Sequence, residues 1–147
     1  MIRVFFDASV LFAASYSKTG SARDLLREAV RGNVRVVVTQ HVLREAEDSL
    51  ARKAPETVPA LHELLELVGP EVGALPTLPE LRRTVTYINL KDAPIVAGAV
   101  KARVDYLVTW DRKHFIDDAK VGRESGLKIV TPDELMRIIQ ESGLTHG

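Results

Sequence analysis

Apolar residues along this chain fall into two patterns, short concentrated runs and longer stretches with helical spacing. The short runs are rich in β-branched and aromatic residues and predict strands at Ile2–Phe6, 34–39, 106–109 and 128–131. The remaining apolar stretches predict helices at 21–31, 40–53, 61–68, 80–88, 92–100 and from 132 onward. Strands that alternate with helices are typical of a parallel sheet covered on both faces. We therefore predict the α/β fold class, as a three-layer α/β/α sandwich around a central parallel sheet.

Polar residues mark the starts of three predicted helices. Ser21, Asp92 and Thr131 each stand where a helix begins and can accept a hydrogen bond from its first turn. The helix after Asp92 is apolar almost all round, so we expect it to be buried against the sheet. The segment 71–79 contains two prolines and is predicted to be a loop or a short edge strand.

Polar side chains also follow two of the predicted strands. Asp7 and Ser9 come after the first strand, and Thr109 and Asp111 repeat their two-residue spacing at the end of a later one. Residues two apart at a strand end can point the same way. In parallel sheets the ligand crevice lies beyond the carboxyl ends of the strands, where the next helix also begins, as it does at Asp92. The sequence therefore predicts a site at this edge.

Each acid also has an interpretation that involves no ligand. Asp92 can be an ordinary N-cap, Asp111 can begin a turn, and Glu45 can be a solvated helix residue. Asp7 differs, because an acid within the most apolar opening of the chain is costly to place there unless it reaches a crevice. Periodicity leaves open whether Glu45 or Glu47 contributes, since the two flank the apolar face of their helix on opposite sides.

Other polar residues near these acids receive no functional role. We interpret His41 and His114 as packing or surface residues rather than ligands, and Asp117 and Asp118 as loop acids.

Four converging carboxylates require a counter-charge. Two carboxylates about 4 Å apart repel by roughly 4 kcal/mol at an effective dielectric constant near 20. Protons or a hard cation would relieve this repulsion, and Mg²⁺ or Mn²⁺ prefers oxygen ligands. Because the chain has no cysteine, any metal here must be held by oxygen or imidazole groups.

Composition and missing motifs narrow the function classes further. The 147 residues are the size of one domain, which we expect to span 1–147. Twenty basic residues balance 20 acidic ones, so direct specific DNA binding and attraction to an anionic membrane are not expected. The apolar opening is too short to span a bilayer and is a poor signal peptide, which predicts a cytoplasmic location. The glycine-rich phosphate-binding motifs and the G-x-S-x-G nucleophile motif do not occur in the sequence.

Four segments, in this order and spacing, resemble the four motifs of PIN-domain ribonucleases: FDASVLF, LREAEDSL, KDAPIVAGAV and YLVTWDRKHF. The resemblance implies a catalytic, metal-binding set of acids, namely Asp7, Glu45, Asp92 and Asp111. It gives the hydroxyl groups of Ser9 and Thr109 a supporting role, and it selects Glu45 over Glu47. Two positions depart from the family pattern, because Ser9 stands where many relatives have asparagine and Ala46 follows Glu45 where leucine is commoner.

The resemblance also implies a function. The chain would be a metal-dependent endoribonuclease that hydrolyses RNA phosphodiester bonds, with Mg²⁺ or Mn²⁺ activating a water molecule. Many compact relatives are VapC-like toxins of toxin–antitoxin pairs, so we expect an antitoxin protein as a partner and a homodimer. One alternative is a catalytically inactive PIN-like binding or regulatory module. Another is a phosphotransfer domain with Asp7 as acceptor, although FDASV lacks the second acid of the haloacid-dehalogenase pattern.

Overall fold

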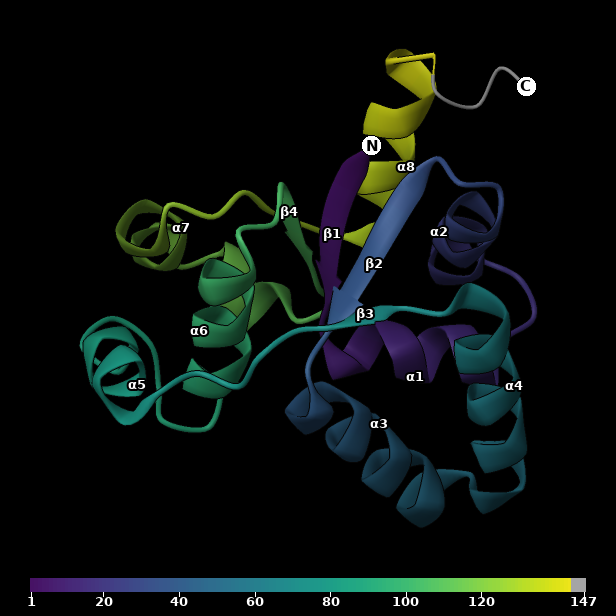
Figure 1. The fold of residues 1–147 in the computed structure, drawn as a ribbon, viewed down its shortest axis with the longest axis horizontal. Helices are drawn as coiled ribbons and strands as arrows, with labels where there is room; N and C mark the ends of the chain where they lie inside the picture. The colour runs from purple at the N-terminus through teal and green to yellow at the C-terminus, as the bar shows by residue number, and fades with distance from the viewer. Residues whose placement is uncertain (144–147) are drawn as a thin grey trace.

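A five-stranded parallel sheet forms the centre of the structure, a computed structural model that describes residues 1–143 (Figure 1). The strand order is β3-β2-β1-β4-β5, and all neighbouring strands pair in parallel. The strands are β1 (Ile2–Phe6), β2 (Val34–Val38), β3 (Glu71–Val72), β4 (Tyr106–Val108) and β5 (Ile129–Val130). The predicted strands are therefore present, and the segment 71–79 supplies the short edge strand.

Helices cover both faces of this sheet. They are α1 (Ala8–Tyr16), α2 (Ser21–Val30), α3 (Gln40–Lys53), α4 (Val58–Val68), α5 (Leu78–Thr84), α6 (Ala93–Ala102), α7 (Ala119–Ser125) and α8 (Pro132–Glu141). A 3-10 turn spans Pro55–Thr57 and a π-helical turn spans Arg112–Ile116. In Figure 1, α5, α6 and α7 lie to one side of the strands and α2 and α4 to the other, which confirms the predicted sandwich. Among the described residues, no helix combines the length and the apolar character needed to cross a membrane.

The central strand β1 explains where a site can form. Val4, Phe5 and Phe6 are all fully buried, as expected of a strand covered on both faces. The chain first builds β2 and β3 on one side of β1 and then crosses to place β4 on the other side. The strand order therefore reverses between β1 and β4, and ligands of parallel sheets bind at the carboxyl ends of such a pair. Asp7 and Thr109 directly follow these two strands.

Helix α6 packs closely on the sheet because it carries Gly98. A Cβ atom at this position would lie 3.2 Å from Thr39 Cγ2 and 3.4 Å from Phe5 Cζ, so the backbone of α6 approaches β1 and the end of β2 directly. Most apolar residues around Gly98 are buried, which confirms the predicted burial of this helix, although Val100 is exposed. This packing positions Asp92, the residue before α6, at the carboxyl edge of the sheet.

Two helices were not predicted from the sequence. Helix α1 continues the apolar opening of the chain and buries Val10, Leu11 and Ala14, so it lacks the polar face that an amphipathic pattern requires. Helix α7 is short, and Asp118 caps it by accepting a hydrogen bond from the N–H of Lys120 at 3.0 Å. Asp118 thus lies in the exposed bend before α7, as expected of a loop acid, and in addition caps the helix.

The boundaries of two predicted helices also differ from the prediction. Gly20, not Ser21, occupies the N-cap position of α2, and the Ser21 hydroxyl instead donates a hydrogen bond to Asp133 on α8. Helix α5 spans Leu78–Thr84 rather than the predicted 80–88. It starts earlier because Thr77 and Glu80 form a capping box in which each side chain binds the other residue's N–H, and it ends earlier because residues 85–87 form turns. At α8 the cap is as predicted, since Thr131 Oγ1 accepts from the N–H of Glu134 at 3.2 Å.

Candidate active site

Asp7 leaves the carboxyl end of β1, and hydroxyl groups hold its carboxylate. Ser9 Oγ and Thr109 Oγ1 both donate to Asp7 Oδ2, at 2.9 and 2.8 Å, and the N–H of Ala8 donates to Oδ1 at 2.7 Å. The backbone N–H of Asp7 donates to the carbonyl of Val108 at 3.0 Å, which extends the β1–β4 pairing beyond the strands. Asp7 is only 5% exposed. The two hydroxyl groups therefore fix the orientation of a buried carboxylate.

The charge on Asp7 is unfavourable in this setting. Burial raises the pKa of Asp7 above its ordinary value, although the hydrogen bonds from Thr109, Ser9 and Ala8 act to lower it. The nearby carboxylate of Asp92 raises the pKa further. Because desolvation disfavours the charged form, a cation close to this carboxylate would stabilise it.

The exit of β4 is tied to the same hydroxyl groups. The N–H of Asp111 donates to Thr109 Oγ1 at 3.0 Å, and the N–H of Trp110 donates to Ser9 Oγ at 3.1 Å. The carboxylate of Asp111 accepts from the N–H of His114 at 3.1 Å and so caps the π-helical turn. Asp111 thus begins a turn, as its structural interpretation predicted, and its half-buried carboxylate also lies at the sheet edge.

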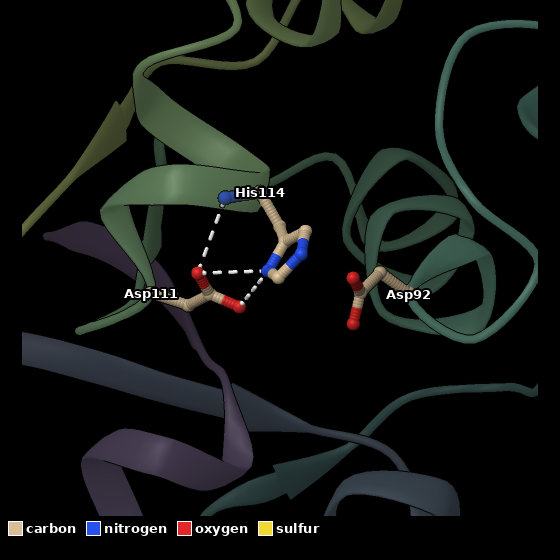
Figure 2. A group of neighbouring side chains, drawn as sticks. All are labelled: Asp92, Asp111 and His114. Carbon is tan, nitrogen blue, oxygen red and sulfur yellow. Dashed lines mark hydrogen bonds and ion pairs between the residues drawn. The ribbon is translucent and has the colours of Figure 1, made fainter.

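His114 joins the acids, a role that the sequence interpretation missed. Its Nδ1 lies 2.9 Å from Asp111 Oδ2. Figure 2 shows its imidazole between the carboxylates of Asp111 and Asp92, and one ligand atom from each of the three residues lies within 4.8 Å of the others. The sequence feature that could have predicted this position is the spacing of His114 from Asp111, since residues three apart in a helical turn are neighbours.

The side chain of Asp92 does not cap α6, which corrects the prediction. Asp92 stands at the N-cap position, but its backbone is already helical (φ −93°, ψ −11°) and its side chain makes no capping hydrogen bond. Capping side chains normally belong to residues with extended backbone, from which they reach the free N–H groups of the first turn. Instead, Asp92 Oδ2 accepts from Asn89 Nδ2 at 2.8 Å. The carboxylate can therefore face Asp111 and His114.

Glu45 lies on α3, and the charges of the other acids affect its pKa. Burial raises the pKa of Glu45 above its ordinary value, and the carboxylates of Asp7 and, to a smaller extent, Asp92 raise it further. The charges of His41 and Lys91 act in the opposite direction. Glu45 is thus electrostatically part of the acid group.

Glu47 and His41 complete the description of α3. Glu47 is exposed and its carboxylate lies 3.2 Å from Nε2 of His62 on α4, so it faces away from the acid group. His41 Nε2 lies 3.5 Å from Glu45 Oε2, and this buried nitrogen makes no hydrogen bond within residues 1–143. His41 is therefore a neighbour of Glu45 rather than a simple surface residue.

The predicted acids form two overlapping groups at the carboxyl edge of the sheet. Asp7 and Glu45 are linked with Asp92 because the Asp92 carboxylate raises the pKa of both, and Asp92 and Asp111 are linked with His114 by distance. Asp92 belongs to both groups. The carboxylate oxygens of these groups suit Mg²⁺ or Mn²⁺. The raised pKa of buried Asp7 also favours a cation, because hydrogen bonds alone do not offset its burial.

Comparison with known proteins gave one family match. A family model described as PIN domain matches residues 3–113. A comparison with curated proteins gave no match.

Solved structures share the fold at low sequence identity. PAE2754 from Pyrobaculum aerophilum is 18% identical with a TM-score of 0.64, over 95% of this chain and 90% of that one. VapBC2 from Rickettsia felis, bound to a DNA fragment from its promoter, is 15% identical with a TM-score of 0.66, over 88% of this chain and 98% of that one. FitAcB from Neisseria gonorrhoeae is 14% identical with a TM-score of 0.58, over 88% and 97%.

Proposed function

The chain belongs to the PIN-domain family, and from this premise we propose that it is a metal-dependent endoribonuclease that acts as the toxin of a toxin–antitoxin pair. The observation that carries the proposal is the crowding of Asp7, Glu45 and Asp92. Burial raises the pKa of both Asp7 and Glu45, and a neighbouring carboxylate raises each one further. Elsewhere in the described chain a basic partner lowers the pKa of an acid, as Arg3 does for Glu71. The crowded acids instead suit a bound cation.

Mg²⁺ or Mn²⁺ fits this set of donors. The ion would be held by four carboxylates: Asp7, Glu45, Asp92 and Asp111. When bound, such an ion polarises a phosphodiester and lowers the pKa of a coordinated water molecule.

The other residues position these carboxylates. Ser9 and Thr109 orient Asp7 through the hydroxyl hydrogen bonds, and Thr109 also binds the backbone of Asp111, so the ends of β1 and β4 are held in register. Asn89 orients Asp92 by bonding both its carboxylate and its N–H. Groups that fix ligands in this way commonly change metal affinity or activity by about 10- to 100-fold when mutated.

The proposed partners follow from the family. RNA would be the substrate, in the cytoplasm, and an antitoxin protein would bind and inhibit the chain. VapBC2 from Rickettsia felis was crystallised on a promoter fragment, and we propose that a comparable partner accompanies this chain. A homodimer is part of the same proposal.

The decisive experiment tests RNA cleavage with and without metal. Structured and single-stranded RNAs are incubated with the protein in Mg²⁺ or Mn²⁺ and in a chelator. Asp7→Asn, Asp92→Asn and Asp111→Asn each preserve size but remove a charged ligand, so each should abolish cleavage while the protein stays folded. Cleavage that survives both the chelator and Asp92→Asn would overturn the proposal. A folded protein that binds RNA but cuts none would favour the inactive module.

A matched pair on α3 refines the test. Glu45→Gln should reduce cleavage strongly, whereas Glu47→Gln should leave it within about twofold, because Glu47 is exposed and faces His62. Ser9→Ala and Thr109→Ala should lower activity by roughly 10- to 100-fold, less than the acid variants, since hydroxyl groups orient ligands without supplying charge. Equal effects of the two glutamate variants would remove Glu45 from the proposed site.

A further inference from the structure

The basic residues of this protein divide into paired and unpaired sets. Most ion pairs lie away from the acid site: Arg3 and Arg35 with Glu71, Arg27 with Asp24, Arg31 with Glu28, Lys101 with Glu80. By contrast, Arg44, Arg52 and Lys91 are exposed and form no ion pair among residues 1–143, and the same holds for Lys113 and Lys120. These cations can therefore attract anions from solution at little cost.

The first of two grooves beside the acids contains three of these cations. This α3 groove has a volume of about 600 Å³, and its lining includes Arg44, Arg52, Lys53 and Lys91 together with Glu45. Basic residues outnumber acidic ones in its lining, although the chain as a whole has a net charge of zero. The groove thus combines a local positive charge with one of the proposed metal ligands.

The second groove includes His114, which lies beside Asp92 and Asp111. This α7 groove has a volume of about 340 Å³ and is lined by residues 85–89, Lys113, His114, Asp118 and Lys120. His114 faces Asp92 and Asp111 (Figure 2), and Asn89 binds the Asp92 carboxylate. The α7 groove thus also reaches the acid group.

The two grooves meet at one short loop. Asn89 lines the α7 groove and Lys91 lines the α3 groove, so residues 89–91 border both. Asp92 follows directly in the chain. A polyanion in contact with both grooves would therefore cross this loop, next to Asp92.

We propose that the two grooves form one track for the backbone of a single RNA strand, with the phosphodiester to be cut lying over Asp92 and Asp111. This inference rests on the proposed ribonuclease function and adds the path of the substrate. Phosphates on one side of the cut contact Arg44 and Lys91, and those on the other side contact Lys113 and Lys120. Basic grooves that follow the backbone are the usual means of binding single strands without reading sequence.

Two observations favour a single strand over a duplex. Asp7 is almost completely buried and Asp92 and Asp111 are half-buried, so the reacting phosphate has to enter a recess. Trp110, next to Asp111, is 38% exposed. Exposed aromatic rings stack on unpaired bases, which a duplex does not offer.

The test measures binding with cleavage switched off. A fluorescently labelled, unstructured RNA of about 12 nucleotides, within the site sizes of single-strand binders, is titrated with the full chain in a chelator. The affinity is followed by anisotropy between about 50 and 200 mM salt. Two double variants remove the cations of one groove each, Arg44→Gln/Lys91→Gln and Lys113→Gln/Lys120→Gln. Arg137→Gln is the matched control, because Arg137 is an exposed, unpaired arginine of the described chain on α8, outside both grooves.

The expected result is quantitative. Each phosphate contact to a single strand contributes about 0.7 to the slope of log affinity against log salt. Each double variant should therefore lower the slope by about 1.4 and the affinity by roughly 25-fold near 0.1 M salt. The variant with all four substitutions should lower the slope by about twice that amount. One RNA should bind per chain, and a stable hairpin should bind less tightly than the unstructured strand. Arg137→Gln should match the parent.

Several outcomes would overturn the track. The salt slopes of both double variants could equal that of Arg137→Gln, or only one double variant could lower the slope. Two RNAs could bind per chain, or the hairpin could bind as tightly as the single strand. Binding without metal separates this inference from the proposed function. If the slopes change as expected but no RNA is cut in Mg²⁺ or Mn²⁺, the ribonuclease proposal fails and the track stands. If cleavage depends on Asp92 but the slopes do not change, the track is wrong and the ribonuclease proposal stands.

Discussion

Burial of Asp7 links the stability of the protein to pH. The pKa of Asp7 is raised in the folded state, so between its ordinary value and the raised one the folded chain binds more protons than the unfolded chain. The stability of the metal-free protein therefore falls as pH rises through this window. Asp7→Asn removes the titrating group, so the variant should gain stability relative to the parent as pH rises above the ordinary pKa of an aspartate, about 4. Urea unfolding in a chelator across this pH range measures the difference.

Glu80 provides a control with the opposite sign. The hydrogen bond from Lys101 is the largest cause that lowers the pKa of Glu80, to about 2. The stability from this carboxylate is present above its ordinary pKa and is lost as pH falls towards 2. Glu80→Gln should therefore become more destabilising as pH rises over that lower range. Parallel pH profiles for Asp7→Asn and Glu80→Gln would contradict the predicted shift at Asp7.

Substitution of Asp92 tests whether a bound cation neutralises the crowded carboxylates. Because its carboxylate makes no capping bond to α6 and lies close to other acids, Asp92→Asn should leave the metal-free protein as stable as the parent or more so. Added Mg²⁺ should raise the melting temperature of the parent more than that of the variant, since a ligand that binds only the folded state stabilises in proportion to its affinity. Differential scanning fluorimetry measures both shifts. Equal shifts would remove Asp92 from the metal site.

At the scale of elements, the contact of α6 with the sheet places Asp92. A larger residue at Gly98 would push α6 away from Thr39 and Phe5, which lie 3.2 and 3.4 Å from the position of an added Cβ. Gly98→Val should lower the free energy of unfolding by about 1–3 kcal/mol, the usual cost of overpacking. Ala51→Val, at an exposed position of α3, should cost only about 0.5 kcal/mol through helix propensity. Equal losses in chemical denaturation would show that the α6 contact tolerates bulk.

At the scale of the whole molecule, charge bears on the choice of partner. The formal net charge is zero, so the chain has no overall positive field to attract duplex DNA. If it pairs with an antitoxin, the operator contacts should come from that partner. The purified chain should give no specific gel shift with its own promoter, although the reconstituted pair should. Tight, sequence-specific promoter binding by the chain alone would contradict this prediction.

The sequence by itself determined the features that depend only on residues close together in the chain. The strands are short, largely apolar runs, and acids stand at or soon after the ends of two of them, so both the parallel sheet and the placement of Asp7 and Asp111 at its edge followed from the order of residues. The cap at Thr131 followed in the same way. The motifs identified the family, which the match over residues 3–113 confirmed. A single domain over 1–147 stays a prediction.

Only the tertiary structure decided features that depend on neighbours distant in sequence. Helix α1 is buried by surrounding elements and so shows no amphipathic period. The helical backbone at Asp92 turns its carboxylate from a cap towards Asp111, and the π-helical turn brings His114 between them. The packing of α4 against α3 provides His62 as a partner for Glu47 and leaves Glu45 beside the acids. Residue types and spacing establish which groups are present, whereas the packing of helices on the sheet determines which of them meet.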